Sequence, residues 1–150
     1  MIKIGFLGCG RIAKRHVEVC RDELINAKVS AVYDTVLEKA LKCSKELNAK
    51  CVESFDELLN QKIDVIVVLT ESGKHTKHAR RVLESGIHVI VEKPAALIPL
   101  EIFATEELAA KKGLMYAVIL QNRLNPAMQK LKQTFDSGRF GKLVLATIRL

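Results

Sequence analysis

The chain alternates short apolar runs with longer stretches in which apolar positions recur every three or four residues. The run Asp64–Leu69 (DVIVVL) is apolar at consecutive positions, which predicts a central strand buried on both faces of a parallel sheet. Val36, Ala40, Cys43 and Leu47 follow helical spacing, which predicts a helix with one buried face. Further strands are predicted at 2–7, 29–34, 51–52, 88–91 and 114–119, and further helices at 11–26, 55–60, 75–85 and 100–112.

Local signals at the ends of these segments support the same division. Ser54 with Glu57 three residues later is a capping-box pattern that predicts a helix start. Gly86 and Gly113 fall where the preceding helices should stop. Because strands and helices alternate along the first 120 residues, we predict an α/β fold, a doubly wound parallel sheet with right-handed crossovers and helices on both faces.

The alternation ends near residue 120. Asn125 followed by Pro126 predicts a new helix start, and residues 141–150 (GKLVLATIRL) predict a strand inside which the chain stops. We therefore expect residues 1–120 to be a complete domain and residues 121–150 to be the truncated start of a second, α+β domain. Since an unpaired strand edge is prone to pair with another copy, a homo-oligomer is also expected.

The composition is that of an ordinary globular protein, with 49% hydrophobic and 27% charged residues among 150. No apolar run is long enough for a membrane span, and the N-terminus has no signal-peptide pattern. The net charge of +7 fits a lysine-rich surface better than attraction of anionic ligands, and the scattered basic residues argue against nucleic-acid binding. The four cysteines lack CxxC and zinc-ligand spacing, so we expect no metal and reduced thiols in the cytoplasm.

One turn carries candidate chemistry. Residues Gly8-Cys9-Gly10-Arg11-Ile12-Ala13 fit the pattern G-x-G-x-x-G/A between a predicted strand and a predicted helix. Gly8 would permit a tight turn, Gly10 would let a pyrophosphate approach the backbone, and Ala13 would let helix and strand pack closely. Unpaired N–H groups of residues such as Arg11 and Ile12 would hold the phosphates. In this context we favour a Rossmann dinucleotide site over a simple glycine turn.

Asp34 ends the second predicted strand, 21 residues after Ala13. An acid at this position accepts hydrogen bonds from the adenosine ribose hydroxyls and repels a 2′-phosphate. Thr35 follows, where an arginine could have paired with that phosphate. We therefore favour NAD over NADP, and a helix-capping role for Asp34 stays open.

The predicted strand at 88–91 runs into Glu92-Lys93-Pro94. Ligands of open parallel sheets bind beyond the carboxyl ends of the strands, so these residues fall at the mouth of the predicted site. A lysine beside a cofactor ring can donate to a substrate oxygen or take its proton. From spacing alone, however, a surface lysine at a strand end is the stronger interpretation.

The wider set of motifs resembles one family over essentially the whole chain. The matching parts are Ile4–Ala13 with His16, then Thr70 and His75 after the fourth strand, and finally Ala79–Pro94 (ARRVLESGIHVIVEKP). Together they are similar to the glucose–fructose oxidoreductase, inositol dehydrogenase and MocA (Gfo/Idh/MocA) family of NAD(P)-dependent oxidoreductases.

The resemblance implies roles for several residues. Thr70 and Ser72 would lie along the cofactor, and Glu92 would sit near the nicotinamide ribose. Lys93 would be catalytic, contacting the substrate hydroxyl that loses its proton. The bond between Lys93 and Pro94 is expected to be cis.

Two neighbouring positions are less clear from the resemblance. His75 would either contact the cofactor or act as a helix-cap or packing histidine. Glu71 stands where the family usually has a proline, which removes rigidity from the loop and adds a negative charge near the cofactor.

Gln121-Asn122-Arg123 follows the last predicted strand of the first domain. The segment looks like that of the UDP-N-acetylglucosaminuronate 3-dehydrogenases and related nucleotide-sugar enzymes. This implies that Gln121 contacts the cofactor, whereas Asn122 and Arg123 contact the substrate, since an arginine fork suits a carboxylate or phosphate. A surface arginine at a domain junction is the alternative.

The expected protein is an NAD(P)-dependent dehydrogenase that moves hydride from a secondary hydroxyl of a sugar or nucleotide-sugar to NAD. Two alternatives stay open: a non-catalytic dinucleotide-binding or regulatory domain, and a family member acting on a non-sugar substrate. The family's second catalytic motif, an Asp and a His, is expected beyond residue 150. The 150-residue chain is therefore expected to bind dinucleotide without turning over substrate.

Overall fold

In the computed structural model, which describes residues 1–147, the first 119 residues form a six-stranded parallel sheet with helices on both faces. The strand order is β3-β2-β1-β4-β5-β6, and each neighbouring pair is parallel. The predicted doubly wound α/β fold is thus confirmed. The strands are β1 (Ile2–Leu7), β2 (Ala27–Tyr33), β3 (Lys50–Cys51), β4 (Val65–Val68), β5 (His88–Val91) and β6 (Tyr116–Val118). The helices of this unit are α1 (Ala13–Asp22), α2 (Leu37–Leu47), α3 (Phe55–Leu59), α4 (His75–Glu84) and α5 (Pro99–Lys112).

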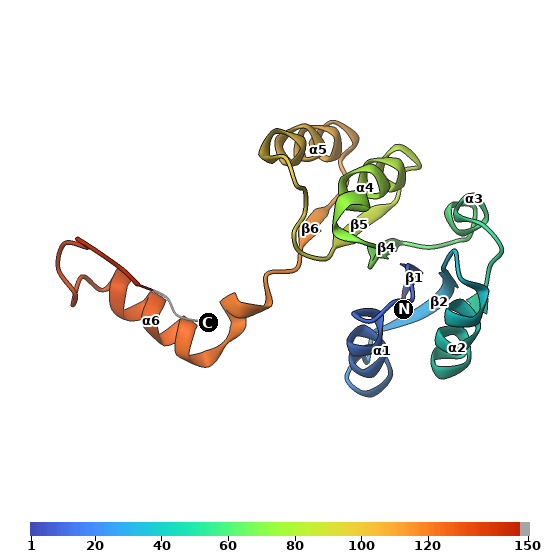
Figure 1. The fold of residues 1–150 in the computed structure, drawn as a ribbon, viewed down its shortest axis with the longest axis horizontal. Coiled ribbons are helices and arrows are strands. Elements are labelled where there is room, and N and C mark those ends of the chain that lie inside the picture. Colours follow the sequence, from blue (N-terminus) through green and yellow to red (C-terminus); the bar gives the residue numbers. More distant parts are fainter. Residues whose placement is uncertain (148–150) are drawn as a thin grey trace. The chain divides into compact units, whose positions relative to one another are not determined.

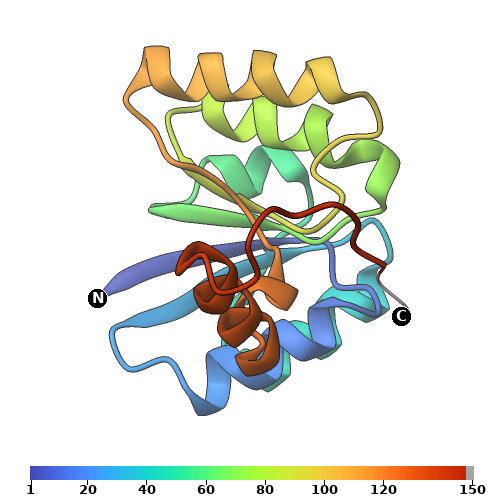
Figure 2. The same cartoon turned by 90° about the vertical axis from the view of Figure 1, so that its left-hand side faces the viewer.

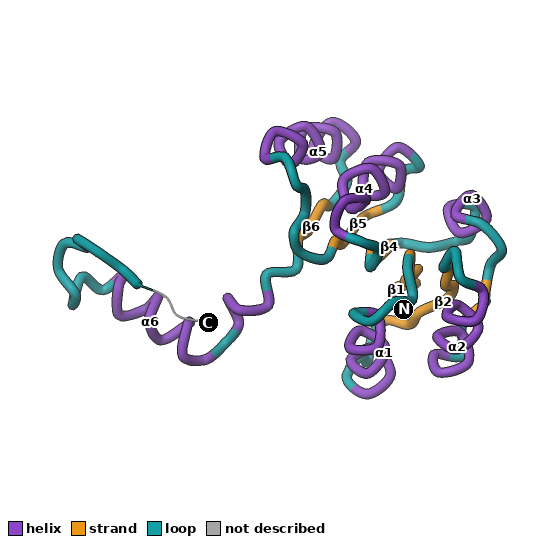
Figure 3. Tube along the Cα trace, in the orientation of Figure 1, coloured by secondary structure: helices purple, strands orange, loops and turns teal. Residues whose placement is uncertain are grey.

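Helices cover both faces of the sheet (Figures 1 and 3), and the side chains of the central strands divide between two cores, one on each face. In β4, Ile66 and Val68 pack into the core that α3, α4 and α5 cover. Val65 and Val67 pack into the core that α1 and α2 cover. The alternation explains why this strand is apolar at every position, as the sequence pattern predicts. Figure 2 shows the strands of this unit between the two helical layers.

The chain order places a crevice between β1 and β4. β2 and β3 lie to one side of β1, whereas β4, β5 and β6 lie to the other. The connection from β1 to β2 therefore runs in the opposite direction to the connection from β4 to β5. As a result, the loops that follow β1 and β4 lead away from each other. In open parallel sheets such a reversal, at the carboxyl ends of the strands, is where ligands bind.

The first helix is shorter than the sequence predicts. Residues 11–26 were expected to be helical, but α1 begins at Ala13 and ends at Asp22. Arg11 and Ile12 belong to a turn, closed by a hydrogen bond from the Ala13 amide to the Gly10 carbonyl at 3.1 Å. Arg11 and Ile12 are both exposed, and the buried face of the helix begins at Ala13, which is 2% exposed.

Most of the residues predicted to begin or end helices do so in the structure. The Ser54 hydroxyl accepts a hydrogen bond from the Glu57 amide at 3.0 Å, which caps α3. The Glu57 carboxylate, however, reaches the amide of Glu53 rather than that of the capping serine. Gly86 and Gly113 follow α4 and α5 with φ values of +79° and +64°, which only glycine adopts without strain.

The described residues from Leu120 onward belong to a second unit. It contains a 3₁₀ turn at Gln121–Leu124 and helix α6 (Pro126–Asp136), capped by the Asn125 side chain, which accepts from the Ala127 amide at 2.9 Å. The predicted strand at 141–150 is wrong for residues 141–147, which form no strand; residues 148–150 lie outside the described part. A strand needs a partner for its backbone groups, and none of the described residues pairs with this segment.

Candidate functional site

The turn between β1 and α1 is built from two glycines with different tasks. Gly8 has φ +98°, and a Cβ there would lie 2.8 Å from the carbonyl carbon of Leu69 on the neighbouring strand end. Gly8 is therefore required for the turn to pass the end of β4. At Gly10 a Cβ would meet no described atom within 4 Å. Unlike Gly8, Gly10 is not needed to avoid a clash with another part of the chain. Its missing side chain leaves open space beside the backbone.

The start of α1 offers unpaired backbone donors. Among the described hydrogen bonds, the amides of Gly10, Arg11 and Ile12 have no acceptor. Amide groups at a helix N-terminus, reinforced by the helix dipole, suit a phosphate. The open space at Gly10 and these three donors fit the diphosphate of a dinucleotide.

Asp34 lies at the end of β2 and supports the turn. Its Oδ2 accepts from the Cys9 amide at 2.7 Å, and its Oδ1 accepts from the Val36 amide at 2.8 Å. The second bond goes to the residue before α2, and no side chain caps that helix, so the capping alternative is not realised. Because each carboxylate oxygen can accept a further bond, Asp34 can also serve ribose hydroxyls.

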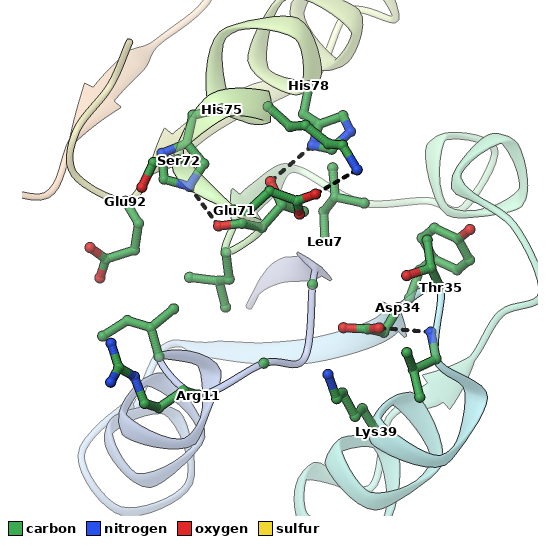
Figure 4. A pocket seen from close by; sticks show the side chains of 18 of the residues that line it. Leu7, Arg11, Asp34, Thr35, Lys39, Glu71, Ser72, His75, His78 and Glu92 are labelled. Atoms are coloured by element: carbon green, nitrogen blue, oxygen red, sulfur yellow. Dashed lines mark hydrogen bonds and ion pairs between the residues drawn. The ribbon is translucent and has the colours of Figure 1, made fainter. Parts of the chain in front are cut away.

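The turn, Asp34 and the loops after β4 and β5 surround one cavity of about 710 Å³. Figure 4 shows Arg11 reaching it from the start of α1, Asp34 and Lys39 from the β2–α2 side, and His75 and Glu92 from the other half of the sheet. A dinucleotide needs an elongated site of this kind, with donors at its centre. Of the predicted site residues, the cavity is lined by Gly8, Gly10, Arg11, Ile12, Asp34, Thr70, Ser72, His75, Glu92 and Lys93.

The loop after β4 keeps the backbone that a proline would impose, although Glu71 has replaced it. Glu71 has φ −68° and ψ 145°, values that proline also adopts. Its carboxylate pairs with Lys74 at 2.5 Å, and a hydrogen bond from Lys74 lowers the pKa of Glu71. Glu71 therefore has the backbone angles of a proline, and its added charge has a neighbouring cation.

Glu71→Pro is expected to stabilise the chain. Proline would fix a φ angle that Glu71 already has, and so reduce the entropy of the unfolded chain by the equivalent of about 0.4–1 kcal/mol. Thermal unfolding followed by circular dichroism would show the gain as a higher Tm. A matched control is Lys42→Pro in the middle of α2, which should lower the Tm because proline breaks a helix interior. A lower Tm for Glu71→Pro would contradict the assigned loop conformation.

His75 is buried at the first position of α4, with 2% of its surface exposed. Its Nδ1 lies 2.7 Å from the Pro94 carbonyl oxygen and its Nε2 lies 2.8 Å from the Thr70 carbonyl oxygen. Both ring nitrogens thus face carbonyl oxygens of the chain itself, and a neutral imidazole donates to one of the two. This favours the packing interpretation over a direct cofactor contact, and gives His75 the task of tying the β4 loop to the turn after β5.

Glu92 is a buried carboxylate, 6% exposed, at the end of β5. Its Oε1 lies 2.8 Å from Nε2 of His16 on α1, and its Oε2 accepts from the Lys93 amide at 3.0 Å. Residues 76 positions apart are thereby joined across the crevice. The pair fixes the end of β5, and with it Lys93, relative to the helix that begins at the phosphate turn.

His16→Ala should destabilise the chain, because it removes the partner of a buried carboxylate. The expected loss is about 1–3 kcal/mol in the free energy of unfolding, measured by urea denaturation. Arg15→Ala is the matched control on the same helix, since its pair with Glu18 is exposed and should matter little. If both variants changed the free energy of unfolding equally, the His16–Glu92 contact would contribute no more to stability than an exposed ion pair.

Lys93 follows Glu92 at the rim of the cavity. The Lys93–Pro94 peptide bond is cis, as the resemblance predicts. The residue is exposed, and its ammonium group has no ion-pair or hydrogen-bond partner among the described residues. The backbone amide of Lys93 is bonded to Glu92, whereas its ammonium group is available to a ligand.

His78, one turn along α4 from Lys74, contributes a pH-sensitive contact. Its Nδ1 lies 2.9 Å from the Thr70 hydroxyl, its ring packs edge-on against Phe55 at 5.5 Å, and burial lowers the pKa of His78 below its ordinary 6.5. Below pH 6.5 the unfolded chain therefore binds a proton before the folded chain does, and stability falls with acidification. We expect the Tm to drop between about pH 7 and pH 5.5, and to drop less in His78→Gln. An unchanged pH dependence in that variant would contradict the assignment.

Half of the residues that line the cavity were predicted from the sequence. Lys39 and His78 also line it, although neither gave a signal in the sequence. His16 belonged to the matching motif without a role, and helix packing brings it to Glu92, 76 positions away. Gln121, Asn122 and Arg123 lie in the second unit, in the 3₁₀ turn before α6, so their predicted contacts stay predictions.

Comparison with known proteins assigns the chain to a family. The Gfo/Idh/MocA family, described as an oxidoreductase family with an NAD-binding Rossmann fold, matches residues 2–120. The chain belongs to this family. The resemblance drawn from the motifs is therefore confirmed, and so is NAD as the cofactor of this domain.

Relatives of the chain act on different substrates. It is 26% identical over 140 residues to the UDP-N-acetylglucosamine 3-dehydrogenase of Acidithiobacillus ferrooxidans, covering 93% of this chain and 44% of that protein. It is 35% identical over 115 residues to the L-aspartate dehydrogenase of Methanococcus maripaludis, covering 75% of this chain and 43% of that protein. The chain thus spans less than half the length of these relatives.

One similar solved structure contains a dinucleotide together with a nucleotide-sugar. The WlbA dehydrogenase from Bordetella pertussis, in complex with NADH and UDP-GlcNAcA, matches with a TM-score of 0.89 at 31% identity, covering 94% of this chain and 41% of that chain. None of the described helices of the present chain is long and apolar enough to cross a membrane.

Proposed function

We propose that this chain is the cofactor-binding part of a dehydrogenase that oxidises a secondary hydroxyl of a sugar or nucleotide-sugar with NAD. The observation that carries the proposal is that Lys93 lines the same cavity as the phosphate turn, while its ammonium group has no partner among the described residues. A domain that only binds dinucleotide has no need of a free lysine at that end. The UDP-GlcNAcA bound to the WlbA relative supports a nucleotide-sugar as substrate.

The geometry suggests how the chain would work. Bound NAD supplies the hydride acceptor. The amides of Gly10, Arg11 and Ile12 would hold its diphosphate, and Asp34 would accept from its adenosine ribose. At the far end Lys93 would donate to the substrate hydroxyl, or in its neutral form take the proton from it.

Several residues would hold this arrangement in place. His16 and Glu92 would fix the end of β5, and His75 would fix the loop that carries Thr70 and Ser72 along the cofactor. Within the second unit, Gln121 would meet the cofactor, while Asn122 and Arg123 would meet the substrate. We propose that residues 121–150 begin the domain that completes the substrate site.

Binding and turnover are tested separately. Calorimetric titration of the 150-residue chain with NADH should show one site, with weaker binding of NADPH because Asp34 repels a 2′-phosphate. The same chain should form no NADH from NAD with any sugar substrate. The full-length gene product should do so with UDP-sugar uronates or with free polyols. Substrate-dependent NADH formation by the 150-residue chain would contradict the proposed division of labour.

A second candidate substrate class follows from one relative. The identity of 35% to an L-aspartate dehydrogenase favours an amine or imine substrate as the alternative. Including L-aspartate in the substrate panel distinguishes the two. Turnover of L-aspartate alone would overturn the sugar assignment while leaving NAD binding intact.

We further propose a homo-oligomeric protein of the cytoplasm. Four free cysteines among the described residues fit a reducing compartment. The α6 residues Met128, Leu131 and Phe135 are exposed and suit a contact with further protein. Light scattering of the full-length gene product should give a dimer or tetramer, and a monomer would contradict this.

A further inference from the structure

Two cysteines meet behind the phosphate turn. Cys9 lies between Gly8 and Gly10, half-buried, with its thiol 3.8 Å from the Tyr33 carbonyl oxygen. Cys43 lies on the inner face of α2, 6% exposed, in the core against which Cys9 packs. The turn that would carry the diphosphate therefore has a second thiol from another element beside it.

A second cavity gives access to this pair. It has a volume of about 310 Å³ between the turn, α1 and α2, and both Cys9 and Cys43 line it. Its other polar lining is cationic apart from one glutamate, and no described salt bridge involves any of these charges. Among the charges that act on Cys43, those of Glu46 and Asp34 raise the pKa of its thiol. The charged residues of this lining are Arg11, Lys14, Lys39, Lys42 and Glu46.

The two thiols are not equivalent. A hydrogen bond with Cys9 lowers the pKa of Cys43, and the same contact raises the pKa of Cys9. Cys43 is thus the thiol that loses its proton first, and Cys9 remains a neutral neighbour. An attacking thiolate beside a resolving thiol is the arrangement found in redox-sensitive proteins.

We propose that Cys43 and Cys9 form a redox-modification site that takes a hydroperoxide as oxidant. The Cys43 thiolate attacks the peroxide, the O–O bond breaks, and Cys43 becomes a sulfenic acid while water or an alcohol leaves. The Cys9 sulfur then displaces hydroxide from the Cys43 sulfur, and its proton leaves with that hydroxide as water. In total two thiols lose two hydrogens, and the peroxide is reduced.

The bond would affect the cofactor site directly. An S–S bond of about 2.05 Å requires the Cys9 sulfur to move from the Tyr33 carbonyl toward α2, and its backbone follows because both neighbours are glycines. The Cys9 amide is the donor that connects the turn to Asp34. Oxidation should therefore weaken NADH binding, by about tenfold, and bound NADH should slow oxidation in return.

The test uses the reduced 150-residue chain treated with hydrogen peroxide. Intact mass spectrometry should show the loss of two hydrogens, and peptide mapping should join Cys9 to Cys43. Dithiothreitol should reverse both the bond and the loss of NADH affinity. Cys20→Ser and Cys51→Ser are matched controls that should still form the bond.

Several outcomes would overturn the proposal. They are a different cysteine pairing, accumulation of sulfenic or sulfinic acid without a bond, and full NADH affinity in a disulfide-bonded chain. Cys43→Ser should stop bond formation, and circular dichroism would first establish that this variant is folded. Because bond formation is read by mass without any cofactor, its result is independent of whether the proposed dehydrogenase activity is correct.

Discussion

Replacing Gly10 with leucine is expected to abolish NADH binding while leaving the fold intact. No described atom lies within 4 Å of a Cβ at this position, and Gly10 is not among the glycines with positive φ, so the chain itself tolerates a side chain there. The new side chain would instead enter the space where the diphosphate approaches the backbone. Calorimetric titration should show affinity at least about 100-fold lower, or roughly 2.7 kcal/mol.

Gly8→Ala is the matched control for this experiment, because the structure predicts the opposite effect. Its Cβ would collide with the Leu69 backbone at 2.8 Å, and its φ of +98° disfavours any side chain. The cost should be about 1–3 kcal/mol in stability, seen as a lower urea midpoint. If Gly10→Leu unfolded the chain, or bound NADH normally, the assignment of the turn would be wrong.

Lys93→Met in the full-length gene product is expected to lower kcat by about 10³-fold, in the range typical of a lost acid–base group. NADH affinity should change by no more than about threefold, since the Lys93 contact with Glu92 is made by its backbone amide and survives the change. Stopped-flow absorbance would measure turnover, and fluorescence titration would measure NADH binding.

Two further variants separate charge from proton transfer. Lys93→Arg keeps the positive charge but cannot release a proton. Activity should therefore stay low if Lys93 acts as a base. It should recover in part if Lys93 only donates a hydrogen bond to the substrate. Lys111→Met, on the exposed surface of α5, should be fully active because its partner is the solvent-exposed Glu107. Full activity of Lys93→Met would refute the catalytic role.

Much of the fold follows from local patterns in the sequence. The β4 segment is apolar at every position, which predicts its burial on both faces of the sheet. Gly86 and Gly113 mark helix ends, because glycine adopts the positive φ found at both positions without strain. The dinucleotide turn is likewise readable, since its chemistry resides in the spacing of two glycines. These features depend on neighbouring residues, which a sequence displays directly.

What local patterns could not give is the set of contacts between distant segments. The His16–Glu92 pair joins residues 76 positions apart, and the two backbone carbonyls beside His75 come from separate loops. Helix α1 also begins at Ala13 rather than at Arg11, because Arg11 and Ile12 form an exposed turn before it, which apolar spacing alone does not reveal. The strand expected at 141–150 failed over residues 141–147 because β structure depends on a partner, which its own sequence does not supply.

Asp34 constrains how coenzyme preference could evolve in this protein. Its carboxylate accepts from the Cys9 and Val36 amides, so it shapes the turn as well as facing the cofactor cavity. A single exchange of this acid for serine, of the kind that would admit a 2′-phosphate, would also loosen the turn that every dinucleotide must use. A lineage shifting toward NADP would therefore pass through a poor binder of both coenzymes, unless a compensating change near residue 9 came first.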